Sequence, residues 1–119
     1  MRALGDDYEQ RAVCFLQAHH LRIIARNFSA KTGEIDIIAQ HNKLLSFIEV
    51  RARSNPCFDS AAASVDQRKQ QRIINTAQLF LQQHPRWADM PCRFDVIAFT
   101  LPKAGSALQM RWIRAAFTT

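Results

Sequence analysis

The chain has 119 residues, enough for one domain with a modest core, and we expect a single domain over residues 1–119. Lys and Arg number 16 against 10 Asp and Glu, and the formal net charge of +6 favours polyanionic partners such as nucleic acid. No apolar run approaches the roughly 18 residues of a membrane span. The three cysteines form neither a disulfide framework nor a zinc pattern. A cytoplasmic protein with no membrane partner is therefore expected.

The chain is predicted to begin with a helix and a strand. Apolar residues recur with helical spacing over residues 6–19, and Gly5 with the acidic pair behind it suits a helix start. Residues 21–28 have the composition of a strand, and residues 29–33 are predicted to form a loop.

Two consecutive apolar runs, 35–39 and 44–51, each carry a carboxylate, Asp36 in the first and Glu49 in the second. Continuous apolar runs are typical of strands buried on both faces. An ionised carboxylate there costs several kcal/mol unless a cation or hydrogen-bond donors compensate it. A shared divalent metal ion would compensate both groups. The alternative is a buried ion pair with Arg51.

The spacing of the two runs predicts how their side chains face each other. A two-residue hairpin turn at 42–43 would place Asp36 opposite Glu49 and Glu34 opposite Arg51. Asparagine at the first turn position tolerates the left-handed backbone that such a turn requires. A slip by one residue would separate the carboxylates, so the inference depends on this register.

The second half of the chain adds a helix and two strands. The helix is predicted from residue 62 or 65 to residue 83, with three basic residues in its first turns, and His84 and Pro85 close it. Residues 92–101 and 108–117 read as strands, and Asp95 in the first of them as a structural aspartate. The order α-β-β-β-α-β-β predicts an α/β fold, a mixed sheet flanked by helices.

Three separated motifs carry a resemblance: Gly33-Glu34-Ile35-Asp36, Phe47-Ile48-Glu49-Val50-Arg51 and Arg93-Phe94-Asp95-Val96. In this order they resemble the YraN-like family of uncharacterised bacterial proteins, which Gly5, Glu9, Ala12, Ala25-Arg26-Asn27 and Lys69 also match. That family in turn is similar to the restriction-endonuclease-like superfamily and, within it, to archaeal Holliday-junction resolvases. The superfamily signature is an aspartate followed by Glu-x-Lys on the next strand.

The resemblance implies a restriction-endonuclease-like fold with a Mg²⁺ (or Mn²⁺) site. Asp36 and Glu49 would bind the metal, and Glu9 would complete the set. Arg51 occupies the lysine position; it stays protonated, so it can stabilise charge on a phosphate but cannot act as a general base. Lys69 is the other candidate for that role. The expected nucleic-acid contacts are Arg53, Arg68, Lys69 and Arg72, with Arg26 and Lys31 on weaker grounds.

Two functions fit these residues, and a third remains open. The first is a Mg-dependent nuclease acting on DNA, branched or single-stranded. The second is a catalytically inactive nucleic-acid-binding or recombination accessory protein, because Arg51 replaces the usual lysine. A protein-interaction domain that keeps only the fold is the third. Junction resolvases act as dimers, so a homodimer would fit the resemblance.

Overall fold

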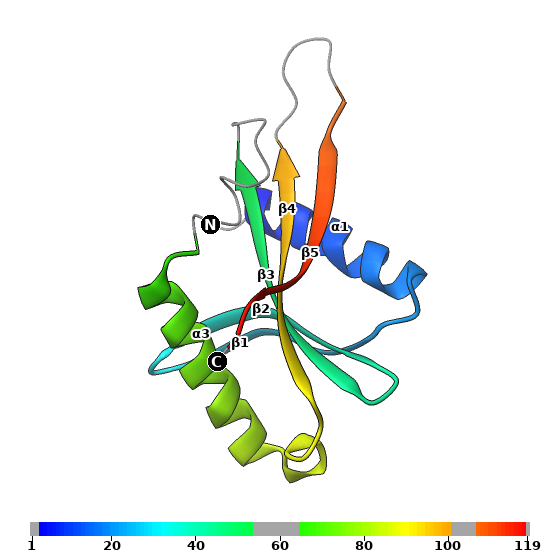
Figure 1. The fold of residues 1–119 in the computed structure, drawn as a ribbon. Coiled ribbons are helices and arrows are strands. Elements are labelled where there is room, and N and C mark those ends of the chain that lie inside the picture. Colours follow the sequence, from blue (N-terminus) through cyan, green and yellow to red (C-terminus); the bar gives the residue numbers. More distant parts are fainter. Residues whose placement is uncertain (1–2, 54–64, 101–106, 119) are drawn as a thin grey trace.

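A computed structural model describes residues 3–53, 65–100 and 107–118 of the chain (Figure 1). Its elements are α1 (Ala3–Ala18), β1 (Arg22–Ala30), β2 (Gly33–His41), β3 (Leu44–Arg53), α3 (Gln67–Gln83), the short 3-10 helix η1 (Pro85–Trp87), β4 (Cys92–Thr100) and β5 (Gln109–Phe117). The predicted order of one helix, three strands, one helix and two strands is confirmed. None of the described helices is both long and apolar enough to cross a bilayer.

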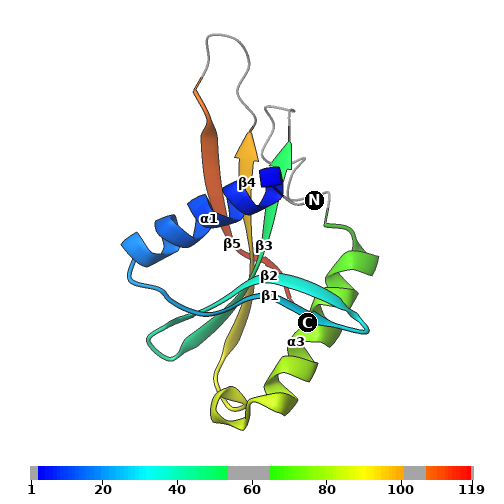
Figure 2. The ribbon, with the colours of Figure 1, turned by 180° about the vertical axis from the view of Figure 1, so that it is seen from behind.

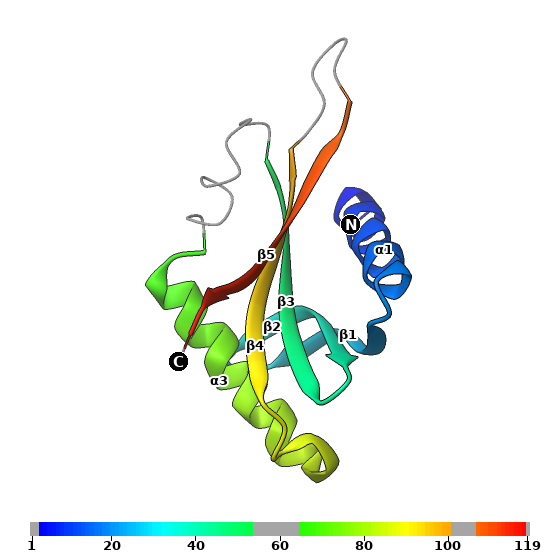
Figure 3. The same cartoon turned by 45° about the vertical axis from the view of Figure 1, so that its right-hand side comes forward.

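The five strands form one mixed sheet in the order β1-β2-β3-β4-β5. Neighbours are antiparallel except β3 and β4, which are parallel and are separated in sequence by α3. The β1–β2 hairpin turns strongly away from the direction of β4 and β5 (Figure 2), as the twist of a sheet requires. In Figure 3, α1 and α3 lie on opposite faces of the sheet. The predicted mixed sheet flanked by helices is confirmed.

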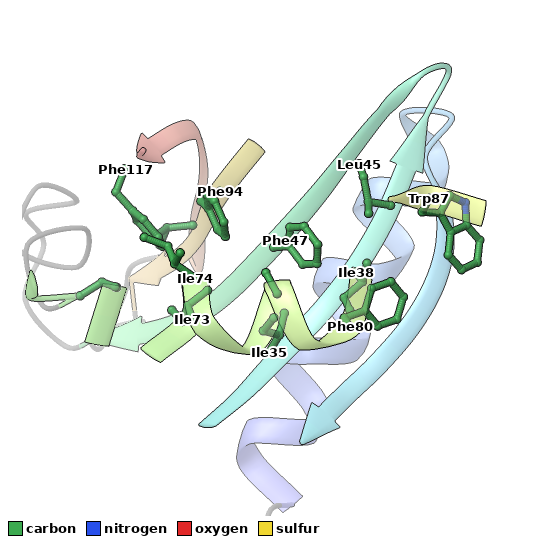
Figure 4. Packing of buried hydrophobic residues seen from close by; sticks show 13 residues of the cluster. Ile35, Ile38, Leu45, Phe47, Ile73, Ile74, Phe80, Trp87, Phe94 and Phe117 are labelled. Atoms are coloured by element: carbon green, nitrogen blue, oxygen red, sulfur yellow. The ribbon is translucent and has the colours of Figure 1, made fainter. Parts of the chain in front are cut away.

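Each face of the sheet has its own hydrophobic core. On one face Ile73 and Phe80 of α3 pack with Ile38 and Phe47 of the sheet (Figure 4). On the other face the buried side of α1 packs on the strands through the cluster Tyr8, Ala12, Val13, Leu16, Ile37, Ala39, Ile48, Ile97 and Phe99. Full burial of one such large side chain stabilises the fold by about 1.5–3 kcal/mol. Burial on both faces explains the continuous apolar runs of β2 and β3.

The structure corrects several predicted boundaries. α1 begins at Ala3 rather than residue 6, because glycine and acidic residues are compatible with a first helical turn as well as with the position before it. The predicted loop over residues 29–33 is wrong, since Ser29 pairs with Glu34 and Ala30 with Gly33, leaving a two-residue turn. α3 begins at Gln67, two residues after one of its predicted starts; the other, residue 62, lies outside the described ranges.

Side-chain hydrogen bonds fix where α3 begins and hold the β1–β2 turn against it. The Asp66 carboxylate caps the helix by accepting from the Lys69 N–H at 2.9 Å. The hydroxyls of Thr32 and Thr76 are hydrogen-bonded at 2.6 Å. Gly33 has a φ of +149°, which favours glycine, and a Cβ there would lie 3.6 Å from the Arg72 Cβ. The turn is thus packed against α3 three residues before Asp36.

Asp95 is a structural aspartate, as predicted. It is 1% exposed and accepts five hydrogen bonds: from Ser46 Oγ (2.8 Å), Arg93 Nε (2.9 Å) and Nη2 (3.0 Å), Trp112 Nε1 (3.0 Å) and the Ala115 N–H (2.9 Å). The β4–β5 register shifts at this residue, and Ala115 has a φ of 50°. Asp95 therefore joins β3, β4 and β5 at an irregular point of the sheet.

Candidate metal and nucleic-acid site

The candidate site lies where the pairing of β2 and β3 ends. The described pairs run from His41–Leu44 to Ile37–Ile48, which is the predicted register, and Asn42 in the turn has a φ of 55°. Asp36 and Glu49 occupy the next position in that register. There the Val50 N–H donates to Asp36 Oδ2 at 2.8 Å. A side-chain oxygen thus takes the place of the backbone carbonyl that would accept this hydrogen bond in a regular sheet. Glu34, predicted opposite Arg51, accepts from Ser29 Oγ of β1 at 3.1 Å.

The two strand carboxylates are buried against each other. Asp36 is 9% exposed and Glu49 is 7% exposed. Burial, a hydrogen bond with the Glu49 carboxyl and repulsion from its charge raise the pKa of Asp36 to about 9; Glu9 adds a smaller repulsion, and the Val50 N–H acts in the opposite direction. Without a bound metal ion, the pair therefore holds a proton over most of the neutral range.

Lys69 of α3 reaches the same carboxylates. Its Nζ lies 3.0 Å from Glu49 Oε2, and the lysine side chain is 37% exposed. That contact lacks hydrogen-bond geometry, and among the described residues no donor bonds to Glu49 Oε2, although the atom is fully buried. A buried carboxylate oxygen with no directed donor is a place where a cation would add stabilisation.

Two small cavities, each of about 230 Å³, share Asp36, Glu49 and Lys69 in their walls. One is also lined by Gly33, Glu34, Arg72 and Ile73, and the other by Tyr8, Glu9, Val50, Arg51 and Ala52. The structure thus brings together Glu9, Asp36, Glu49, Arg51, Lys69 and Arg72 around one carboxylate pair. Arg68 lines neither cavity, and the side chain of Arg53 lies outside what the structure describes.

Arg26 has a role that sequence analysis missed. Its Nη1 donates to Gln10 Oε1 at 3.0 Å, and its Nη2 lies 3.9 Å from Glu9 Oε1. The arginine therefore joins β1 to α1 beside the buried Glu9, which is 4% exposed. The match of Ala25-Arg26-Asn27 to a family motif is the sequence signal for this role, whereas the basic charge of Arg26 by itself predicts only a phosphate contact.

The residues present fit a divalent metal ion through the strand pair. Carboxylate oxygens are hard donors of the kind that Mg²⁺ and Mn²⁺ prefer. Over the three described ranges, no three Asp, Glu, His or Cys side chains are already gathered closely enough to hold one ion. Asp36 and Glu49 would therefore hold the metal, with Glu9 facing them across the cavity and water or phosphate completing the shell.

The raised pKa of Asp36 predicts the pH dependence of stability in the metal-free protein. Because the folded-state pKa is higher than the unfolded value, the stabilisation from proton binding is complete below about pH 4 and is lost as the pH rises through about 9. The slope cannot exceed about 1.4 kcal/mol per pH unit for one proton. Urea unfolding in EDTA at several pH values measures it. A flat profile between pH 5 and pH 9 would contradict the shift.

Comparison with known proteins gives relatives that span the whole fold. The chain is 46% identical to a UPF0102 protein of Stutzerimonas stutzeri, covering 95% of this chain and 92% of the relative. It is 46% identical to a UPF0102 protein of Saccharophagus degradans, covering 96% of this chain and 92% of the relative. It is 45% identical to a UPF0102 protein of Alcanivorax borkumensis, covering 95% of this chain and 90% of the relative. The model of the uncharacterised protein family UPF0102 matches residues 8–99, from the buried side of α1 to the end of β4. The chain belongs to the UPF0102 family.

Proposed function

We propose that this protein is a metal-dependent nuclease whose site is built on Asp36 and Glu49. The observation that carries the proposal is the buried carboxylate pair beside Lys69, at the point where two strands stop pairing. A purely structural aspartate in this chain, Asp95, accepts five hydrogen bonds. Asp36 and Glu49 instead repel each other, and a cation would remove that repulsion.

The cationic side chains around the pair would bind the non-bridging oxygens of a phosphodiester. When bound, a divalent ion would supply Lewis acidity and lower the pKa of a coordinated water. Lys69 and Arg72 would bind non-bridging phosphate oxygens from α3, and Arg51 would do so from β3. Arg26 would keep Glu9 oriented toward the pair. Because Arg51 cannot accept a proton, Lys69 is the residue to which we assign the role of the lysine in the Glu-x-Lys motif.

Cleavage of a panel of labelled substrates tests the function. The panel contains linear, flapped, four-way-junction and single-stranded DNA together with RNA, each with Mg²⁺ or Mn²⁺ and with Glu49→Gln as the control. Product that disappears with Glu49→Gln supports the nuclease and names its substrate. The second candidate function, binding without chemistry, rests on Arg51 replacing lysine. It predicts no product from any substrate and salt-sensitive binding by both proteins.

Lys69→Gln is expected to lower cleavage about 100-fold while leaving the fold intact. The change removes a cation that would stabilise developing negative charge, and one such donor typically contributes this much. Lys69 is 37% exposed, so its loss costs little stability. The matched control is Lys43→Gln in the exposed β2–β3 turn, which should cleave like the wild type. Equal turnover by the two variants would remove Lys69 from the mechanism.

A further inference from the structure

A further hollow lies beside α3, and neither carboxylate of the pair lines it. It has a volume of about 630 Å³ and is lined by Gln67, Arg68, Gln70, Gln71, Gln78 and Thr118. Ile74, which is 8% exposed, also lines it. The C-terminal end of β5 runs beside α3 in Figure 3, and Thr118, which follows β5 in the sequence, is one of the lining residues. We call this hollow the glutamine groove.

The glutamine groove and the candidate site are neighbours across one helix. Successive residues of the first turn, Arg68 and Lys69, line the groove and the carboxylate cavities respectively. Side chains at consecutive helical positions point about 100° apart, so α3 forms a ridge between the two hollows. Arg72, one turn further, lines the site on the same ridge. A ligand that leaves the site over the first turns of α3 therefore reaches the groove.

The charge of α3 identifies the kind of ligand. The helix contains three basic residues and no acidic ones. Residues 61–119 as a whole carry eight basic and three acidic side chains. Glutamine amides both donate and accept, so they can bond phosphate oxygens and the edges of nucleobases. Hollows of about 300–1,000 Å³ suit small ligands. With a volume of about 630 Å³, the groove therefore has room for a few nucleotides of one strand.

We propose that the glutamine groove binds a single-stranded segment of nucleic acid that crosses α3 from the carboxylate site. Arg68 binds a phosphate on the ridge, and Gln67, Gln71 and Gln78 bond phosphate oxygens and base edges in the groove. The inference rests on the proposed function for the class of ligand, nucleic acid, but it does not require cleavage. A substrate with a single-stranded part, such as a flap or an overhang, is then preferred to a blunt duplex.

The test is binding of labelled single-stranded DNA and of a blunt duplex of equal length, measured by fluorescence anisotropy in EDTA at low salt. The variant is Gln67→Glu with Gln78→Glu, which adds two negative charges to the groove at nearly constant volume and helix propensity. The control is Gln17→Glu with Gln83→Glu, which adds the same charge at exposed helical positions that do not line the groove. Thermal unfolding verifies that both variants fold.

The proposal predicts that the groove variant binds the single strand about tenfold more weakly than the control does, while the two bind the duplex within about twofold of each other. Equal affinities of groove variant and control for the single strand overturn it. So does an equal loss for both ligands, which would indicate general charge repulsion. A groove that serves a peptide partner gives the first of these results. Because EDTA removes the metal, a protein that never cleaves can still pass this test, and an active nuclease can fail it.

Discussion

Asp36→Asn is expected to abolish cleavage and to stabilise the metal-free protein. If Asp36 holds the metal as proposed, loss of its carboxylate removes several kcal/mol of transition-state stabilisation, so turnover should fall about a thousandfold. In the wild type the Val50 N–H donates to Asp36 Oδ2 at 2.8 Å. Asparagine keeps an oxygen that can accept this hydrogen bond, so the fold should be retained. At pH 8 Asp36 must take up a proton on folding, whereas asparagine is already neutral, so the free energy of unfolding should rise by about 1–2 kcal/mol. Cleavage assays and urea unfolding in EDTA measure the two effects.

Lower cleavage together with higher stability in Asp36→Asn would distinguish a functional Asp36–Glu49 pair from one that only stabilises the fold. A buried ion pair maintained for the fold would lose stability when Asp36 became neutral, because its partner would be left uncompensated. Asp7→Asn, an exposed aspartate of α1, is the control and should change neither quantity. A less stable Asp36→Asn protein would contradict the raised pKa and favour the structural interpretation.

Asp95→Ala is expected to destabilise the protein by about 3–5 kcal/mol, because it leaves the buried donor of Ser46 and the half-buried donors of Arg93 and Trp112 without their acceptor. Chemical unfolding of the purified variant at pH 7 measures this loss. The change lies in the interior of β4 rather than in either cavity of the candidate site. Any loss of cleavage should therefore follow the loss of folded protein.

The exposed Asp89 provides the control for this variant. Asp89→Ala should change the free energy of unfolding by no more than about 0.5 kcal/mol. If the two alanine variants were equally stable, the five hydrogen bonds of Asp95 would contribute little to the fold. The role assigned to this residue from both sequence and structure would then be wrong.

The pairing of the two strand carboxylates could be predicted because it depends on local rules. Alternation along a strand and a two-residue turn fix the register, and an asparagine that tolerates a positive φ marks the turn. Asp36 and Glu49 are therefore neighbours by counting alone, and the paired residues from Ile37–Ile48 to His41–Leu44 confirm the count. The order of elements followed from hydrophobic periodicity in the same way.

The surroundings of that pair do not follow from local rules, because they depend on how helices pack across the sheet; only the family resemblance pointed to Glu9 and Lys69, which line one of the cavities. Neither the 3.0 Å contact of Lys69 with Glu49 nor the approach of Arg26 to Glu9 has a local signal. Arg68 and Lys69 are adjacent basic residues in the sequence, yet they line different hollows beside α3. Consecutive residues of a helix point about 100° apart. The separation of Arg68 from Lys69 therefore follows from the sequence once the buried face of the helix is known.

Binding of Mn²⁺ to the metal-free protein is the measurement that tests the central claim most directly. Isothermal titration is carried out on the wild type and on Glu49→Gln, with single-stranded DNA present and absent, at two pH values below 9. The account predicts binding that Glu49→Gln abolishes and that tightens as the pH rises toward about 9, because the proton shared by Asp36 and Glu49 must leave. Mn²⁺ binding that is equally strong in Glu49→Gln, or absent from both proteins with DNA present, would contradict it.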